Sequence, residues 1–296
     1  MQTAIKFNLL LHNDILKTYP KLSLPSNLIR QCLGHDLMLP QKHGSASFIF
    51  SCFALSIDGK ICYPDSSSGL DIAQANNYAT DQEKSADWFS LMVARGISDA
   101  VIFSSNIFKI DANRKKPTLS IEALKIDRIS NHKLAKLTPI IFCRDLNTID
   151  FAHEMLVDAT QPFFILHQQH NFNQEVRDGW NQQNISEFSN TSHKIKHLLY
   201  IDIPFTAIWD KLNSSGYHVI LNESPFFHHK LLEEQLLAEI WLNYSCSYIG
   251  GNALSLGCTQ KSFTRTNHPD TEILALYNIN YNFLYSRQLV KYASKL

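Results

Sequence analysis

The sequence predicts an α/β domain with a central, mostly parallel mixed sheet flanked by helices. Three observations support this fold class: one unbroken apolar run, shorter apolar runs further along the chain, and amphipathic helical segments between them. Residues 46–57 carry apolar, β-branched and aromatic side chains without alternation, which is typical of a strand buried on both faces. The Asp58-Gly59 turn that follows favours a strand over a helix. Strands that alternate with helices indicate parallel pairing through crossover connections.

The amino-acid composition limits the classes of protein to which the chain can belong. The chain has 296 residues, of which 45% are hydrophobic and 18% charged, so it can bury a sizeable core in one domain. Its 27 Lys and Arg balance 27 Asp and Glu, which argues against a nucleic-acid partner. The six cysteines are scattered without a C-x-x-C pair, which predicts reduced thiols in a cytoplasmic protein and no metal site. No segment approaches the ~20 apolar residues of a membrane helix, so we expect no membrane partner.

The first element is an N-terminal extension over residues 1–45. Weak helical patterns cover residues 5–17 and 27–32, and Pro20 and Pro25 separate them. We therefore expect this extension to be helical.

A longer helix follows the first buried strand. Thr80 and Glu83 have the spacing of a capping box, in which the hydroxyl accepts the third amide and the carboxylate reaches back to the first. Apolar residues then recur at helical spacing until Gly96, where we expect the helix to end.

The remaining elements follow from shorter patterns. Two more helices are expected, one over residues 205–212 that ends at Gly216 and one over residues 227–236. Residues 181–196 are polar and predict a loop. The late strands lack helices between them, which suggests antiparallel additions at one edge of the sheet. The expected strands after the first are residues 99–103, 139–143, 163–167, 198–203, 218–221, 240–244 and 283–290.

Three strand ends carry residues suited to chemistry, because ligands of open α/β sheets bind beyond the carboxyl ends of the strands. The first places Asp58 after the buried strand, as a candidate substrate carboxylate or simply as part of a turn. The second ends in Ser104-Ser105-Asn106, which would hold a nucleotide or cap the next helix.

The third strand end reads Asn222-Glu223-Ser224-Pro225. Ser224 suits the N-cap of the next helix and Pro225 its first position, so the helix dipole there favours an anion. Glu223 is either a substrate carboxylate or a residue that stabilises the dipole. His228 and His229, which follow in this helix, are interpreted as an exposed polar pair.

In this order, the three junctions resemble the reductase domain of riboflavin biosynthesis, and more specifically the stand-alone pyrimidine reductases of the dihydrofolate-reductase-like fold. The family's S-[LI]-D-G-[KR] strand end is matched by residues 56–60, and its A-D-A-V-L-V-G-A-G-T segment by residues 94–106. Its L-x-E-G-G-P segment is matched by residues 221–225, and its closing F-L-F-L-R-Y strand by residues 282–287. The resemblance spans residues 46–290.

The resemblance implies a dihydrofolate-reductase-like reductase domain over residues 46–296. It implies an enzyme, a 5-amino-6-(5-phosphoribosylamino)uracil reductase, that transfers a hydride from NADPH to C1' of the ribosylamino group of a pyrimidine phosphate. It also implies a homodimer through the late edge strands, since an unpaired apolar edge is a liability. Asp58 and Glu223 would hold the substrate. The residues expected to line the cofactor are Ala54, Ser105, Asn106, Ser224, Pro225 and Phe226, with Arg144 assigned to the adenosine phosphate on charge alone.

Two alternatives remain open. A pterin reductase resembling dihydrofolate reductase would need a carboxylate that faces the pteridine. A non-catalytic nucleotide-binding relative is suggested by residues 104–106, which replace the family's glycine-rich turn and its threonine, and by Glu223 and Ser224, which replace two glycines. Glycines at these positions let the family's backbone approach phosphates closely. The H-x-E and P-C-x-x-C motifs of a deaminase partner are absent, so only the reduction step is expected.

Overall fold

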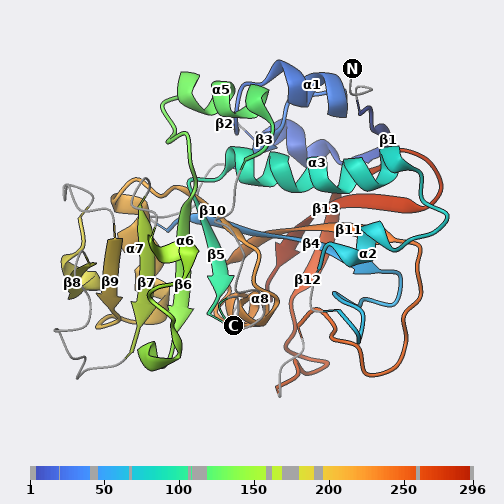
Figure 1. Cartoon of the computed structure of the whole chain (residues 1–296). Helices are drawn as coiled ribbons and strands as arrows, with labels where there is room; N and C mark the ends of the chain where they lie inside the picture. Colours follow the sequence, from blue (N-terminus) through green and yellow to red (C-terminus); the bar gives the residue numbers. More distant parts are fainter. Residues whose placement is uncertain are drawn as a thin grey trace.

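A large twisted sheet organises the computed structural model of the chain (Figure 1). The model describes residues 5–19, 21–40, 46–66, 69–105, 108, 119–157, 162–168, 180–189, 196–257 and 261–293. Within them the sheet has 11 strands. Their spatial order is β1 (Asn8–His12), β12 (Asp270–Asn278), β13 (Phe283–Lys291), β11 (Leu237–Ser245), β4 (Phe48–Ser56), β10 (Val219–Asn222), β5 (Ala100–Ser104), β6 (Thr138–Cys143), β7 (Phe163–His167), β9 (Lys196–Tyr200) and β8 (Trp180–Asn184).

From β11 across to β8, each strand runs parallel to the next one in the sheet. β13, β12 and β1 continue the sheet beyond β11 in antiparallel pairs. The prediction of a mostly parallel sheet with antiparallel additions on one side is therefore confirmed.

Both faces of the sheet are covered. α1 (Asn27–Leu33), α3 (Asp81–Ile97) and α5 (Glu122–Ser130) lie on one face, and α7 (Phe205–Ser214) and α8 (Pro225–Glu233) contribute to the core on the other (Figure 1). In β4, Phe48 and Phe50 belong to the first core, whereas Ile49 and Phe53 belong to the second. This double burial explains why the β4 sequence shows no alternation.

α3 begins as the sequence predicts but ends differently. Thr80 and Glu83 form both bonds of the capping box. Gly96 does not end the helix, which continues to Ile97. A Cβ atom at Gly96 would lie 3.6 Å from Leu124 Cδ1, so this glycine sits at the contact between α3 and α5. The prediction that Gly96 stops the helix was wrong.

The N-terminal segment is helical only in part. α1 confirms the helix expected over residues 27–32, and Ser26 caps it. Residues 5–17, however, form β1 and a 3₁₀ turn over Asp14–Thr18, so the helix predicted there was wrong. Pairing with β12 determines this conformation, because tertiary contacts override weak helix propensity. The division at residue 45 stays a prediction, although residues on both sides of it share one core.

Two other strands differ from expectation. β8 and a 3₁₀ turn over Ile185–Glu187 occupy part of the predicted loop 181–196, while residues 190–195 lie outside the described residues. β12, for which no strand was expected, lies between β13 and β1.

The sheet margin next to β12 is formed by β1, not by a late strand. Its residues Leu9, Leu10 and Leu11 are 44%, 53% and 43% exposed. The late strands β12 and β13 are both paired on two sides. A homodimer stays a prediction, and the apolar margin available for it is β1.

Candidate active site at the carboxyl edge of the parallel strands

The three predicted strand ends lie on the same edge of the sheet, because β4, β10 and β5 are parallel. Asn222, the last residue of β10, pairs with Ser51 of β4 and Ile102 of β5. The end of β10 is therefore close to the end of β5. Asp58 lies further out, since Ser56 is five residues, or ~16 Å of extended strand, beyond Ser51.

The short length of β10 leaves part of β4 without a neighbour. β10 pairs with residues 48–51 only, whereas β11 pairs with β4 as far as Ser56. We call residues 52–56 the open edge of β4, because in the described chain no strand pairs with them on the side of β10. Ala54 lies in its middle and is half-buried. Backbone groups on this side of β4 are placed to bind a ligand.

Asp58 is held in a turn at the end of this open edge. The Ser56 hydroxyl donates to its carboxylate at 2.6 Å, and the amides of Ile249 and Gly250 donate at 3.2 and 2.8 Å. The Ser56 bond is the main cause that lowers the pKa of Asp58 to about 2, and the two amides act in the same direction. Asp58 is therefore ionised at neutral pH and accepts hydrogen bonds.

The same turn joins two segments that lie 192 positions apart in the sequence. Gly250 has a φ of 71°, and a Cβ there would come within 3.2 Å of the Tyr248 ring. Glycine thus allows the chain to turn beneath Tyr248 and to present its amide to Asp58.

Glu223 is engaged by a cation and does not face the open edge as a free carboxylate. Arg95 Nε and Nη2 each donate to it at 2.7 Å, and the two side chains are only 7% and 9% exposed. The carboxylate raises the pKa of Arg95 against the opposing effect of its burial. The geometry assigns Glu223 to a bidentate ion pair between the β10–α8 junction and α3.

The β10–α8 junction is fixed by a buried polar network. The Asn222 amide group donates to Ser51 Oγ at 2.9 Å, and its carbonyl oxygen accepts the Ser224 backbone amide at 3.1 Å. Ser51 Oγ also contacts His228 Nδ1 at 2.9 Å, and the His228 ring packs edge-to-face on Phe53 at 5.4 Å. Ser51 and His228 were missed as site residues, because only the fold brings their segments together.

Burial determines the protonation of His228. It lowers the pKa of His228 to about 3, with a smaller contribution from His229. His228 and His229 are 3% and 7% exposed, so the interpretation of an exposed polar pair was wrong. The two rings point into the packing of α8 instead of toward solvent.

In the first turn of α8, one backbone amide is bonded to the N-cap side chain and another is free to bind a ligand. Ser224 Oγ accepts the Phe227 amide at 3.3 Å, as the N-cap prediction required, and Pro225 occupies the first helical position. Among the described residues, the Phe226 amide has no acceptor. The Phe226 ring is 46% exposed. A free amide at the positive end of a nine-residue helix suits an anionic group.

The other predicted cofactor residues occupy neighbouring strand ends. Ser105 directly follows β5 and interacts with Cys143, the last residue of β6. Arg144, the next residue along β6, is exposed. Asn106 lies outside the described residues. Within the described residues, no group of three or more His, Cys, Asp or Glu side chains is placed to hold a metal ion, and no helix is long and apolar enough to cross a membrane.

The fold and the strand-edge site together define an α/β protein with a dihydrofolate-reductase-like architecture. The chain is similar to Acinetobacter baumannii RibD, with 16% identity and a TM-score of 0.59 over 83% of this chain and 59% of that chain. It is also similar to a pyrimidine reductase-like protein from Corynebacterium diphtheriae, with 15% identity and a TM-score of 0.58 over 83% of this chain and 93% of that one.

A third neighbour is a Thermotoga maritima diaminohydroxyphosphoribosylaminopyrimidine deaminase/5-amino-6-(5-phosphoribosylamino)uracil reductase, with 13% identity and a TM-score of 0.56 over 82% of this chain and 56% of that chain. This chain thus spans somewhat more than half the length of RibD and of the Thermotoga maritima protein. No protein-family model and no curated protein matches the sequence. The structural neighbours confirm the fold that the order of the motifs predicted.

Proposed function

We propose that this chain is an NADPH-dependent reductase of the riboflavin-biosynthesis type, acting on the ribosylamino group of a pyrimidine phosphate. The observation that carries the proposal is the open edge of β4, which runs between the first turn of α8 and Asp58. Its placement at the carboxyl edge, on a fold shared with RibD and a pyrimidine reductase-like protein, supports a dinucleotide beside a small substrate.

The residues of the strand edge fit a nicotinamide dinucleotide. The Phe226 amide and the dipole of α8 offer a place for the pyrophosphate, and the Ser105 hydroxyl lies at the neighbouring strand end. The exposed guanidinium of Arg144 suits the additional phosphate that distinguishes NADPH from NADH. When bound, the cofactor supplies the hydride, and the protein supplies orientation and electrostatics.

Asp58 would act on the substrate as an acceptor. Its carboxylate, ionised at neutral pH, is oriented by Ser56 and two backbone amides and would receive hydrogen bonds from substrate hydroxyl or amino groups. With a pKa of about 2 it holds no proton to donate at neutral pH. Its role is to position the acceptor carbon for hydride transfer.

A non-catalytic nucleotide-binding protein is the second candidate, and Glu223 is the observation that favours it. The ion pair with Arg95 removes this carboxylate from the set available to a substrate. The serines at positions 104, 105 and 224 also stand where the resembled family has glycine or threonine. On this alternative the strand edge binds a nucleotide without turnover.

Binding and turnover separate the two candidates. We expect saturable NADPH binding, measured by cofactor fluorescence, and NADPH oxidation when the ribosylamino pyrimidine phosphate is added. Asp58→Asn should lower kcat/KM by about 10- to 100-fold through lost positioning while leaving the Kd for NADPH unchanged.

Asp65→Asn, which changes an exposed carboxylate, is the matched control and should leave kinetics unchanged. Absence of saturable binding at millimolar NADPH would rule out the reductase. NADPH binding without oxidation in the presence of the pyrimidine would favour the nucleotide-binding alternative.

A further inference from the structure

Three tyrosine side chains are mostly exposed in the loops near the carboxyl edge of the sheet. Tyr78, Tyr248 and Tyr281 are 87%, 79% and 89% exposed. Tyr78 and Tyr281 belong to neighbouring loops, because the Asn282 side chain donates to the Tyr78 carbonyl at 2.9 Å. Tyr248 differs from these two, because the two residues that follow it donate their backbone amides to Asp58.

The backbone around Tyr248 is fixed by the loop that carries Asp58. Directly before Tyr248, the Ser247 carbonyl accepts the Ile57 amide at 2.9 Å. Directly after it, the next two amides donate to the Asp58 carboxylate at 3.2 and 2.8 Å. The Tyr248 side chain therefore extends from a backbone that hydrogen bonds hold on both sides.

The Tyr248 ring lies against the backbone of Gly250. A Cβ atom at Gly250 would come within 3.2 Å of Tyr248 Cε1 and 3.9 Å of Cδ1, so one edge of the ring covers this glycine. Among the described residues, the ring stacks on no other aromatic ring and its hydroxyl has no hydrogen-bond partner. The Gly250 amide also donates to Asp58 Oδ2, so bond lengths place the edge of the ring within ~9 Å of that oxygen. The ring and the carboxylate therefore border one small area of the surface.

The Asp58 carboxylate keeps the capacity to accept a further hydrogen bond. Among the described residues, Oδ1 accepts the Ser56 hydroxyl and the Ile249 amide, whereas Oδ2 accepts the Gly250 amide. A carboxylate has about four acceptor positions, so Oδ2 can accept one more N–H group. Asp58 is half-buried, so a ligand at the surface can reach it. The site combines an aromatic face with a free acceptor.

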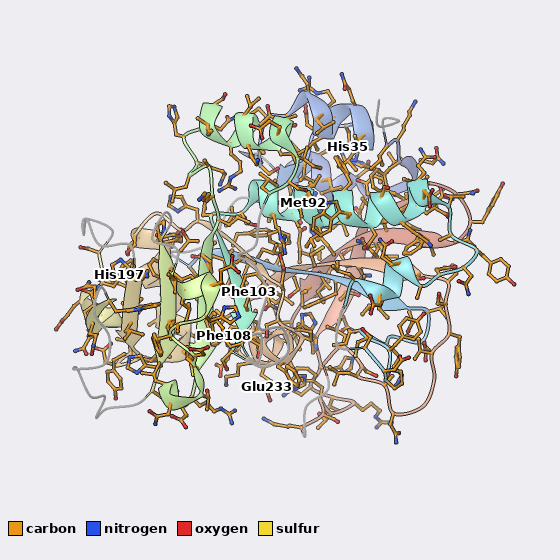
Figure 2. All side chains as sticks on the ribbon, viewed as in Figure 1. His35, Met92, Phe103, Phe108, His197 and Glu233 are labelled. Carbon is orange, nitrogen blue, oxygen red and sulfur yellow. The ribbon has the colours of Figure 1, made fainter. Side chains whose placement is uncertain are left out.

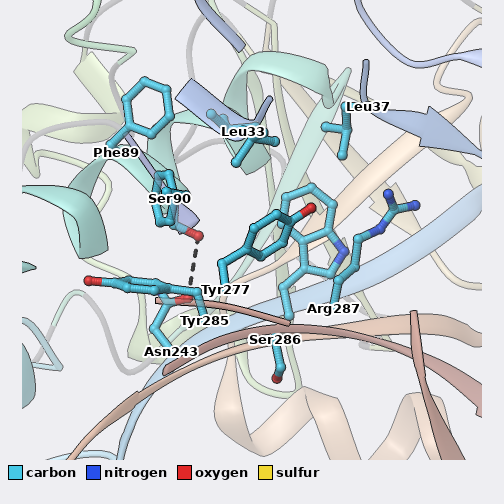
Figure 3. A pocket seen from close by; sticks show the side chains of 12 residues that line it. Leu33, Leu37, Phe89, Ser90, Asn243, Tyr277, Tyr285, Ser286 and Arg287 are labelled. Atoms are coloured by element: carbon cyan, nitrogen blue, oxygen red, sulfur yellow. Dashed lines mark hydrogen bonds between the residues drawn. The ribbon is translucent and has the colours of Figure 1, made fainter. Parts of the chain in front are cut away.

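Two cavities of the described chain lie elsewhere. One, of about 40 Å³, is lined by Phe89, Ser90 and Asn243 among others, and holds only a few water molecules. Figure 3 shows that Ser90 donates to the Asn243 side chain there, at 3.3 Å. The other, of about 240 Å³, borders His35, which lies beside α1 and well apart from Phe103 at the end of β5 (Figure 2). Neither cavity is lined by Asp58 or Tyr248.

We propose that Tyr248 is a specificity-determining residue, whose ring stacks on the pyrimidine base of the substrate while Asp58 Oδ2 accepts an N–H group of that base. This assignment depends on the proposed reductase function and names the part of the substrate that the Asp58 turn recognises. A pyrimidine base has a π-face that stacks on an aromatic ring, and N–H donors at its edge, so one ligand satisfies both groups. A sugar would bind to the carboxylate without using the ring.

Steady-state kinetics of NADPH oxidation by the full chain test this assignment. With the ribosylamino pyrimidine phosphate as substrate, Tyr248→Ala should raise KM by about 10-fold, because stacking on the base is lost, and should change kcat by about twofold or less. Tyr248→Phe keeps the ring and should restore the wild-type KM. The Kd for NADPH should be the same in both variants, since the substituted side chain is mostly exposed and the fold is kept.

Tyr78→Ala and Tyr281→Ala are the matched controls, because each removes an exposed tyrosine from a nearby loop. Both should keep the wild-type KM. An unchanged KM in Tyr248→Ala would overturn the proposal, and so would an equal rise in KM in Tyr248→Phe or in either control.

Binding of a free base separates this proposal from the reductase activity. Calorimetry with 5,6-diaminouracil, a pyrimidine base without ribose phosphate, should show saturable binding that Tyr248→Ala weakens by about 10-fold and Tyr248→Phe retains. If this pattern holds while the wild type oxidises no NADPH, the reductase fails and the base site stands. If NADPH is oxidised but the wild type and Tyr248→Ala bind the base equally, the base site fails and the reductase stands. Absence of saturable base binding by the wild type at millimolar base would also overturn the base site.

Discussion

At the scale of single residues, His228 couples the site to pH. Its Nδ1 shares a hydrogen bond with Ser51 Oγ, which also accepts the Asn222 amide group, so the neutral ring completes a buried network. Protonation would place a charge in this buried network. The ring therefore stays neutral in the folded protein well below the pH at which an exposed histidine is charged.

The lowered pKa of His228 predicts how the stability of the fold depends on pH. The folded pKa of about 3 is below the ordinary value of 6.5, so stability is fully present above pH 6.5 and falls as the pH decreases toward 3. Between pH 7 and 4.5 we expect His228 to account for a loss of about 2–3 kcal/mol in the free energy of unfolding. Urea unfolding of the wild type and of His228→Leu should show a flatter pH dependence in the variant.

The difference in pH dependence between the wild type and His228→Leu is more informative than the wild-type curve alone. Burial raises the pKa of Asp87 to about 6, which strengthens the folded state as the pH falls and partly masks His228. His132→Asn, which replaces an exposed histidine at a positive φ of 59°, is the control and should keep the wild-type slope. Equal slopes for the wild type and His228→Leu would contradict the buried neutral ring.

The Arg95–Glu223 pair gives the second prediction at this scale. Glu223→Gln leaves a buried guanidinium without its counter-charge and should reduce the free energy of unfolding by about 3–5 kcal/mol. Glu122→Gln, in an exposed pair, should cost about 1 kcal/mol or less. The double change Arg95→Met with Glu223→Leu should recover most of the loss, because it removes both charges together.

Kinetics decide between a structural and a substrate role for Glu223. If Glu223→Gln lowers stability while KM for the pyrimidine stays unchanged, the carboxylate belongs to the scaffold. A raised KM at unchanged thermal midpoint would return Glu223 to the substrate-binding set that the motif comparison implied.

At the scale of elements, α3 shows where local patterns succeed and fail. The capping box was predicted from two residues three positions apart, because both of its bonds are local. The end of the helix was not, because the meaning of Gly96 depends on Leu124 in another helix. The same limit applies to β1, whose strand conformation comes from pairing with β12.

Substitutions at the two ends of α3 should have opposite effects. Gly96→Ala adds a Cβ at an ordinary contact distance of 3.6 Å in a helical position, so we expect it to stabilise the protein by about 0.5–1 kcal/mol. Thr80→Ala removes the cap and should destabilise it by about 1 kcal/mol. Urea midpoints measure both. Destabilisation by Gly96→Ala would mean that α5 cannot adjust to the added methyl group.

At the scale of the whole molecule, the sequence predicted the fold class and the edge of the sheet where the three junctions meet. Buried strands leave a strong local pattern, and parallel strands place their carboxyl ends together. The partners within that site were beyond prediction. Asp58 with Gly250, and Glu223 with Arg95, are separated by 192 and 128 positions, and no local spacing relates them.

The N-terminal segment was also understood only from the complete fold. It was predicted as an extension, yet β1 extends the sheet and residues 12–38 form most of a pocket against Arg287. Leu24 and Ile29 of this segment are buried in the same core as α3. A sequence pattern shows that a segment has an apolar side, but it does not show which element packs against that side.

The pairing of β1 with β12 has a consequence for synthesis in the cell. Asn8 pairs with Asn278, 270 positions later, so β1 has no backbone partner until that length of chain has been synthesised. Until then the exposed leucines of β1 favour aggregation of the nascent chain and its binding by chaperones. Slower expression at a lower temperature should therefore raise the yield of protein that has not aggregated.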